Sequence, residues 1–242
     1  MTKEPHHSWQ QYANQQLGWF GTDSQEAYNK HLSNPDTRQR IKSAHWLDAN
    51  IIYQFNEHGF RADSFDRGPG FVALGCSHTQ GVGLPYHSMW ATIVAHTLGI
   101  QSWNLGIAGG SMDTCFRMAH YWLPKLKPKF VVILEPRYRL EIHRKKIIES
   151  ISLATDERVA ECWYLKEFAT NEENSHNNQL KNRFAINAIC MELQIPLYHW
   201  TTNTWQQQPV ASIEDSYDEA RDLVHPGVRH NKNFANMILR TV

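Results

Sequence analysis

The chain has 242 residues, and its 24 Lys and Arg side chains balance its 24 Asp and Glu side chains. A chain of this length buries enough surface to fold without disulfides or a structural metal. The balanced charge gives no reason to expect nucleic acid or an anionic membrane as a partner.

The cysteines and the N-terminus indicate a compartment. The four cysteines lie far apart and form no C-x-x-C pair: Cys76, Cys115, Cys162 and Cys190. This spacing argues against a zinc site and a disulfide framework and is typical of a reducing compartment. The N-terminus lacks the apolar segment of a secretory signal peptide, and the longest apolar run, residues 130–134, is too short to span a membrane. We therefore expect a soluble cytoplasmic protein.

The first 60 residues differ from the rest because they are rich in Gln, Asn, Trp and His and lack an apolar core of their own. Asp23 and Glu26 have the spacing of a capping box, which predicts a helix ending near residues 34–35. We predict that residues 1–60 form an N-terminal extension packed on a main domain of residues 61–242.

Two further elements are expected in this extension. Asp36 or Thr37 can cap a second helix that runs through Trp46. Residues 51–55 then have the composition of a strand or an extended arm, and a turn-rich stretch follows them.

After residue 70, short apolar runs alternate with helical patterns. The apolar runs predict strands at 71–75, 100–106, 130–134 and 196–200, and the helical patterns cover 84–98, 111–123, 140–152, 177–193 and 227–239. Continuous apolar runs are typical of parallel strands buried on both faces. The alternation predicts right-handed βαβ units, and therefore an α/β fold with a doubly wound parallel sheet flanked by helices.

The first predicted strand ends in an unusual group of residues. Gly75 is followed by Cys76, Ser77 and His78. In parallel sheets, ligands bind at the carboxyl ends of the strands, which is where these residues fall. A Gly-x-Ser sequence alone fits a structural or phosphate-binding turn equally well, so its meaning depends on whether the chain supplies a base.

A candidate base lies near the C-terminus. Asp222 and His225 are three residues apart, and Pro226 and Gly227 follow directly. A carboxylate at this spacing can accept a hydrogen bond from one imidazole nitrogen and leave the other free to take a proton. A serine hydroxyl needs such a base to act as a nucleophile. Taken alone, the motif also fits a surface turn with a helix-capping aspartate.

Together these motifs resemble the SGNH (GDSL-type) hydrolases, a family of esterases and lipases with a flavodoxin-like sheet. The family's first block, usually Gly-Asp-Ser, here reads Gly75-Cys76-Ser77, and its last block, Asp-x-x-His, corresponds to Asp222 and His225. The resemblance implies a three-layer flavodoxin-like sandwich, with the helical extension added at its N-terminus, and it assigns the nucleophile to Ser77.

The second family block resembles residues 104–113, NLGIAGGSMD. Asn104 opens this block and is a candidate oxyanion or substrate-binding residue, and Gly109 takes the position whose backbone N–H serves the oxyanion hole in the family. The resemblance covers about residues 57–242, and the order of the blocks along the chain makes it specific.

The third family block, Gly-x-Asn-Asp, is absent. The third predicted strand runs instead into EPRYR, residues 135–139, so Arg137 stands near the place of the asparagine that donates to the oxyanion. Arg137 or another group is a candidate for replacing that donor. Arg137 and Arg139 are also candidates for binding a substrate carboxylate or phosphate, and the alternative is a salt bridge to Glu135 or Glu141. The altered block resembles SGNH-like proteins of phage and environmental origin.

The resemblance implies acyl transfer to water. Ser77 would attack a carboxylic ester, including an O-acyl group on a carbohydrate or another small molecule, while His225 moves the proton and Asp222 orients the imidazole. The N–H groups of Ser77 and Gly109 would hold the oxyanion, and no metal or organic cofactor would be required. His78 and His230, beside the motifs, are candidates for lining the pocket, with packing or a surface position as the alternative.

Three other functions stay open. A non-catalytic binding or structural protein would explain the absent asparagine block. A thiol enzyme would use Cys76, although its neighbour matches the nucleophile position. A flavodoxin-like nucleotide binder is disfavoured because the sequence contains no G-x-x-x-x-G-K-[ST] loop. The sequence leaves the oligomeric state open.

Overall fold

A four-stranded parallel sheet forms the centre of the fold. In the computed structural model, the described residues are 4–65, 68–137, 139–144, 147–152, 171–201 and 218–242. The sheet has the order β4 (Gln101–Asn104), β3 (Gly70–Gly75), β5 (Val131–Glu135) and β8 (Leu197–Thr201). Numbered along the chain, this order is 2-1-3-4, as in flavodoxin-like sheets. The predicted α/β class and the four strands are confirmed.

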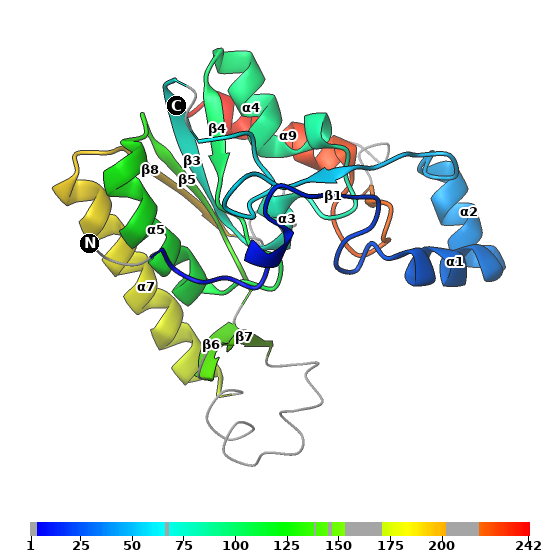
Figure 1. Ribbon diagram of the computed structural model, residues 1–242, viewed down its shortest axis with the longest axis horizontal. Coiled ribbons are helices and arrows are strands. Elements are labelled where there is room, and N and C mark those ends of the chain that lie inside the picture. Colours follow the sequence, from blue (N-terminus) through cyan, green and yellow to red (C-terminus); the bar gives the residue numbers. More distant parts are fainter. Residues whose placement is uncertain (1–3, 66–67, 138, 145–146, 153–170, 202–217) are drawn as a thin grey trace.

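Helices cover both faces of the sheet. Helices α5 (Met112–Leu126) and α7 (Glu172–Glu192) cover one face, and α4 (Trp90–Leu98) and α9 (Val228–Leu239) cover the other (Figure 1). Successive residues of a strand point to opposite faces, so Val72 and Leu74 join the core beneath α5 and α7, whereas Phe71 and Ala73 join the core beneath α4 and α9. The result is the predicted three-layer sandwich.

One predicted helix is wrong. Residues 140–152 form strands β6 (Arg139–Arg144) and β7 (Ile147–Ser152), which pair antiparallel. The sequence RLEIHR alternates polar and apolar residues, and β-branched isoleucines recur in β7, which favours a strand over a helix.

A second predicted helix begins later than expected. Helix α4 begins at Trp90 rather than Leu84, because a 3₁₀ turn, η2 (Tyr86–Ser88), precedes it. It ends, as expected, at Gly99, whose φ of 64° suits a left-handed cap.

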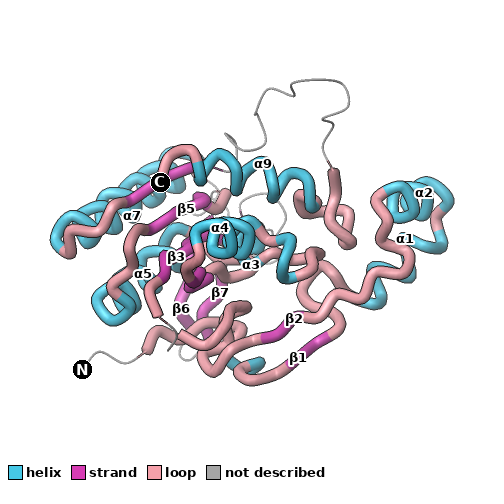
Figure 2. Tube along the Cα trace, turned by 90° about the horizontal axis from the view of Figure 1, so that it is seen from above, coloured by secondary structure: helices cyan, strands magenta, loops and turns pink. Residues whose placement is uncertain are grey.

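The N-terminal residues form two short helices and a two-stranded ribbon. After the 3₁₀ turn η1 (Gln10–Tyr12), strand β1 (Gln16–Leu17) pairs with β2 (Tyr53–Gln54), and α1 (Gln25–Ser33) and α2 (Pro35–Ser43) lie between them. Figure 2 shows α1 and α2 to one side, beyond this ribbon.

The caps of α1 and α2 differ from the predicted ones. Ser24, rather than Asp23, caps α1 by accepting a hydrogen bond from the N–H of Ala27. Asn34 caps α2, and that helix ends at Ser43 instead of reaching residue 46. Serine and asparagine are as suitable as aspartate at this position, so the sequence pattern did not distinguish them.

The N-terminal residues share a buried cluster with the rest of the chain. Phe20, Ile41 and Tyr53 pack together with Leu84 and Ala220. The division of the chain at residue 60 stays a prediction. Of the helices in the described ranges, none combines the length and the apolar character that crossing a bilayer requires.

His7 makes the docking of the N-terminus sensitive to pH. Its side chain is 2% exposed and its Nε2 lies 3.0 Å from the carbonyl oxygen of His58. Burial lowers the pKa of His7 from 6.5 to about 4. In the unfolded chain the imidazole takes up a proton near pH 6.5, whereas in the folded chain it does so only near pH 4. Stability is therefore lost as the pH falls through this window, by up to roughly 3 kcal/mol.

We predict that His7→Gln flattens the decline of the melting temperature between pH 6.5 and pH 4, because glutamine carries no titrating group. Thermal melts across this range measure the effect. His6→Gln is the matched control, since His6 is exposed and should leave the slope as it is. Equal slopes for wild type and His7→Gln would contradict the prediction.

Candidate active site

Ser77 lies at the carboxyl end of β3, as the first residue of the single-turn helix α3 (Ser77–Gln80), and is only 8% exposed. The turn before it leaves no room for a side chain at Gly75. A Cβ there would lie 2.1 Å from Thr79 Oγ1 and 2.8 Å from the carbonyl oxygen of Leu134. The glycine therefore allows the chain to turn sharply from the sheet into α3 and present Ser77.

Ser77, His225 and Asp222 form one hydrogen-bonded chain. His225 Nε2 lies 2.7 Å from Ser77 Oγ, and His225 Nδ1 lies 2.6 Å from Asp222 Oδ2. When Nδ1 carries the ring proton, its N–H donates a hydrogen bond to the carboxylate. Nε2 is then free to accept the hydroxyl proton of Ser77. Three side chains from distant parts of the sequence thus meet at this sheet edge, and the arrangement can activate a serine for nucleophilic attack.

The Asp222 carboxylate is held from several sides. Its Oδ1 accepts the N–H groups of Val224 and His225, each at 3.1 Å, and its Oδ2 accepts the hydroxyl of Thr22 at 2.5 Å as well as His225. Burial by itself would raise the pKa of Asp222, but the hydrogen bonds from His225 and Thr22 outweigh it and hold the pKa below its usual value. The carboxylate is therefore charged where it faces the imidazole.

Gly109 lies in the turn between β4 and α5, with a φ of 78° that favours glycine. Its neighbour Ala108 ties this turn to α3, because the Ala108 N–H donates to Gln80 Oε1 at 2.9 Å. On the other side, Trp9 Nε1 donates to the Ala108 carbonyl at 3.1 Å. In the hydrogen bonding of the described residues, the N–H groups of Ser77 and Gly109 have no acceptor.

Asn104 supports the scaffold. Its Nδ2 donates to the carbonyl oxygen of Thr79 at 2.8 Å, and its Oδ1 accepts the N–H of Gly106 at 3.0 Å. Both polar groups of the amide are therefore engaged by backbone, and Asn104 ties the end of β4 to α3. These contacts give Asn104 a positioning role; its contact with oxyanion or substrate stays a prediction.

His78 packs against the triad histidine. Its ring lies edge-on to that of His225, with centroids 5.3 Å apart. Burial, together with the nearby His225, Arg137 and Arg139, lowers the pKa of His78 to about 3. His78 is therefore neutral at physiological pH. His230, the other histidine predicted near the pocket, pairs through Nδ1 with Asp218 at 2.8 Å.

The end of β5, where the third family block was sought, carries an ion cluster. Glu135 is buried and pairs with Arg183 at 2.8 Å and with His199 at 2.6 Å. Burial would raise the pKa of Glu135, but these two partners hold it below its usual value. Glu135 thus pairs with residues of α7 and β8.

The two arginines of this segment differ in their surroundings. Arg137 is exposed, and its charge contributes to the lowered pKa of His78. Arg139 Nη1 donates to the carbonyl oxygen of Gly110 at 3.2 Å, next to the Gly109 turn. Glu141, the other predicted partner, binds Arg117 at 2.6 Å. In the described ranges no three His, Cys, Asp or Glu side chains are grouped as a metal site requires.

Several residues of the site escaped the sequence analysis. Thr22 holds Asp222, and Gln80 holds the Gly109 turn. Gly83 allows the turn that carries Asp222 to pack closely against it. Thr22 and Asp222 are 200 residues apart, and no local pattern signals such a contact. Of these residues, only Gly83 carried a sequence signal for a close contact, because Gly81 and Gly83 both lie just after the predicted nucleophile turn.

No protein-family model matches the sequence, and no curated protein does. Among solved structures, the chain is similar to a protein assigned to the G-D-S-L lipolytic family from Desulfitobacterium hafniense, with 13% identity, a TM-score of 0.39, and coverage of 72% of this chain and 100% of that one. It is also similar to a lipolytic G-D-S-L protein from Veillonella parvula, with 14% identity, a TM-score of 0.38, and coverage of 72% of this chain and 97% of that one.

A third similar structure is a carbohydrate esterase family 2 enzyme with a carbohydrate-binding domain from Corynascus thermopiles, with 14% identity, a TM-score of 0.38, and coverage of 72% of this chain and 65% of that one. The TM-scores of all three lie below 0.5. A function for this chain therefore has to be argued from its own side chains and motifs.

We predict that Gly83→Ala lowers the reactivity of Ser77 toward a fluorophosphonate by about tenfold or more. A Cβ at Gly83 would lie 2.7 Å from Ala220 Cβ and 3.1 Å from Asp222 Oδ1, so the turn that carries Asp222 must shift. A displacement of this size near reacting groups is expected to slow them strongly. Labelling rates measured by mass spectrometry test this.

Gly99→Ala is the matched control. Gly99 also has a positive φ, of 64°, but a Cβ there meets no atom within 4 Å. Both variants should lose about 1–2 kcal/mol of stability to backbone strain, and only Gly83→Ala should lose labelling. Equal labelling of the two variants would show that the close packing of Gly83 against Asp222 does not matter.

Proposed function

We propose that this protein is a serine esterase that hydrolyses a carboxylic ester through an acyl-enzyme. The observation that carries the proposal is the hydrogen-bonded chain from Ser77 through His225 to Asp222, with contacts of 2.7 and 2.6 Å. The order of the sequence blocks, which resembles that of SGNH hydrolases, supports the same function.

In the proposed reaction, Ser77 Oγ attacks the ester carbonyl while His225 Nε2 takes the hydroxyl proton. His225 then returns the proton to the departing alcohol, and an acyl group remains on Ser77. Water, deprotonated by His225, attacks this acyl group, and His225 returns the proton to Ser77 Oγ as the bond to the acyl group breaks and the acid leaves. Asp222 keeps the imidazole in the required tautomer and stabilises its charged form.

The oxyanion needs donors that are in place before the reaction. We assign this role to the backbone N–H groups of Ser77 and Gly109, since neither is used by another hydrogen bond among the described residues. His78 borders the site as a neutral ring. For the substrate we propose a small ester, including an O-acyl group on a carbohydrate; the mechanism needs no metal or organic cofactor.

We predict that the purified protein hydrolyses p-nitrophenyl acetate and that Ser77→Ala lowers kcat by roughly four orders of magnitude or more, as loss of a triad nucleophile does elsewhere. Cys76→Ala should keep most of the activity, although Cys76 Sγ lies only 3.9 Å from Ser77 Oγ. Ester turnover is followed spectrophotometrically, and a fluorophosphonate should label Ser77.

The two variants control for one another, because both change a buried side chain in the same turn. Activity that survives in Ser77→Ala and is lost in Cys76→Ala would assign the chemistry to the thiol. Folding of both variants is checked by thermal melts.

A second candidate function is that of a non-catalytic binding protein with the same fold. The observation that favours it is the end of β5, where residues 135–139, EPRYR, replace the family's Gly-x-Asn-Asp block and its asparagine donor. Loss of one oxyanion donor typically lowers kcat by 10²–10³. Arg137 is the residue that could compensate, because guanidinium offers several donors and a permanent charge.

We predict that Arg137→Ala lowers kcat for ester hydrolysis by about 10²-fold with an unchanged melting temperature, since Arg137 is exposed and contributes little to the core. Arg38→Ala is the matched control, an equally exposed arginine on α2. If Arg137→Ala and Arg38→Ala both turn over ester at the wild-type rate, the arginine does not replace the asparagine. Feeble turnover in all three proteins would favour the binding function.

A further inference from the structure

The N-terminal segment reaches the triad at one specific atom. Thr22 Oγ1 donates to Asp222 Oδ2 at 2.5 Å, and this is the oxygen that faces His225 Nδ1 at 2.6 Å. The other oxygen of the carboxylate is held by backbone N–H groups of its own turn. Thr22 is thus the contact to Asp222 that comes from outside the turn.

The position of Thr22 is itself fixed. Phe20 and Asp23 exchange two backbone hydrogen bonds, of 2.9 and 3.1 Å, which close a tight turn around Gly21 and Thr22. Gly21 has a φ of 62°, which suits glycine in such a turn. The hydroxyl of Thr22 is therefore presented by a closed loop.

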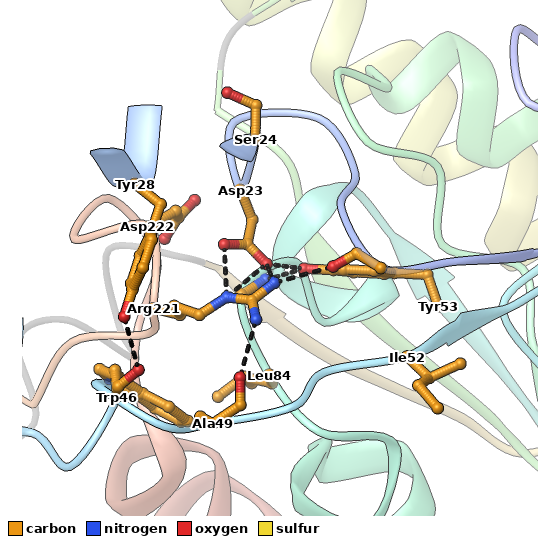
Figure 3. A network of polar contacts seen from close by, with 12 residues as sticks. Asp23, Ser24, Tyr28, Trp46, Ala49, Ile52, Tyr53, Leu84, Arg221 and Asp222 are labelled. Atoms are coloured by element: carbon orange, nitrogen blue, oxygen red, sulfur yellow. Dashed lines mark hydrogen bonds and ion pairs between the residues drawn. The ribbon is translucent and has the colours of Figure 1, made fainter. Parts of the chain in front are cut away.

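A buried ion pair fastens this loop beside the triad. Asp23 binds the guanidinium of Arg221 at 2.7 Å, and Tyr53 donates to the same carboxylate at 2.5 Å (Figure 3). Asp23 and Arg221 are 1% and 3% exposed. Two consecutive residues of one segment, Thr22 and Asp23, therefore meet two consecutive residues of the other, Asp222 and Arg221.

The same N-terminal segment also contacts the opposite side of the site. Trp9 Nε1 donates to the carbonyl oxygen of Ala108, the residue before Gly109. Contacts at both the carboxylate and the Gly109 turn indicate that the segment is part of the site's framework.

We propose that Thr22 is a positioning residue that orients the Asp222 carboxylate toward His225. This proposal rests on the proposed serine-esterase function. The two oxygens of a carboxylate rotate together about the Cβ–Cγ bond. The N–H groups on Oδ1 limit this rotation, and the Thr22 hydroxyl on Oδ2 limits it further and so holds Oδ2 in line with the imidazole. Hydrogen bonds to charged groups are strong enough for their loss to slow turnover about tenfold or more.

The test compares three variants of Thr22 and Thr37. Thr22→Val removes the hydroxyl and puts a methyl group of similar size in its place. Thr22→Ser keeps the hydroxyl. Thr37→Val is the matched control, because Thr37 Oγ1 donates to the carbonyl oxygen of His31 at 2.6 Å within the same N-terminal region and away from the triad.

We expect kcat for ester hydrolysis to fall about tenfold in Thr22→Val with KM little changed, to recover to within about threefold in Thr22→Ser, and to stay at the wild-type value in Thr37→Val. Thermal melts confirm that each variant is folded. A kcat within twofold of wild type in Thr22→Val, or an equal loss in Thr22→Ser, would overturn the proposal.

A second measurement needs no substrate. The proton between His225 Nδ1 and Asp222 Oδ2 should give a low-field proton NMR signal. Its loss in His225→Gln assigns the signal to this proton. We expect Thr22→Val to shift or broaden this signal and Thr22→Ser to restore it. An unchanged signal in Thr22→Val would reject the positioning role even if the protein hydrolyses no ester, and a changed signal without hydrolysis would reject the esterase function alone.

Discussion

The buried ion pair between Asp23 and Arg221 holds the beginning and the end of the chain together beside the candidate active site. Burying two charges is costly unless they are paired and fully hydrogen-bonded. Here the guanidinium also donates to two backbone carbonyls of the N-terminal residues, and the carboxylate also accepts the hydroxyl of Tyr53. Removing either partner would leave the other charge buried and unpaired, which typically costs about 3–5 kcal/mol. The residue after Arg221 is Asp222, which contacts His225, so a contact that stabilises the fold also determines where Asp222 lies.

Charge at the sheet edge is arranged around Ser77 in a related way. Leu134 is in register with Gly75, so Glu135 lies at the same edge of the sheet as the turn that carries Ser77. An unpaired carboxylate there would oppose the negative charge that develops when a serine attacks an ester. Arg183 and His199 compensate this charge on the side of α7 and β8. Arg137 and the neutral ring of His78 then leave the site with positive rather than negative neighbours.

The sequence predicted the features that short local patterns encode. It did not predict the features that depend on contacts between residues far apart in the chain. The four strands were found because continuous apolar runs are specific to buried parallel strands, and Ser77, Asp222 and His225 were found because each belongs to a compact motif. The hairpin after residue 139 was taken for a helix because its charged residues hid the period of two. Asp23 was taken for a helix cap, since a buried aspartate and a capping aspartate look alike until Arg221 is known to face it. Thr22 carried no signal at all, because its partner lies 200 residues away.

The backbone around the triad also weighs against a purely structural role for these residues. Leu223, between Asp222 and His225, has a φ of 55°, a region that non-glycine residues adopt at a cost of about 1–3 kcal/mol. The side chains of Ser77, Asp222 and His225 are all nearly buried, where apolar residues would pack at least as well. A fold that only had to close this turn would need neither the strained leucine nor the buried polar chain. Backbone strain and buried polar side chains occur together at this sheet edge, beside Ser77 Oγ. Such a combination is typical of functional sites.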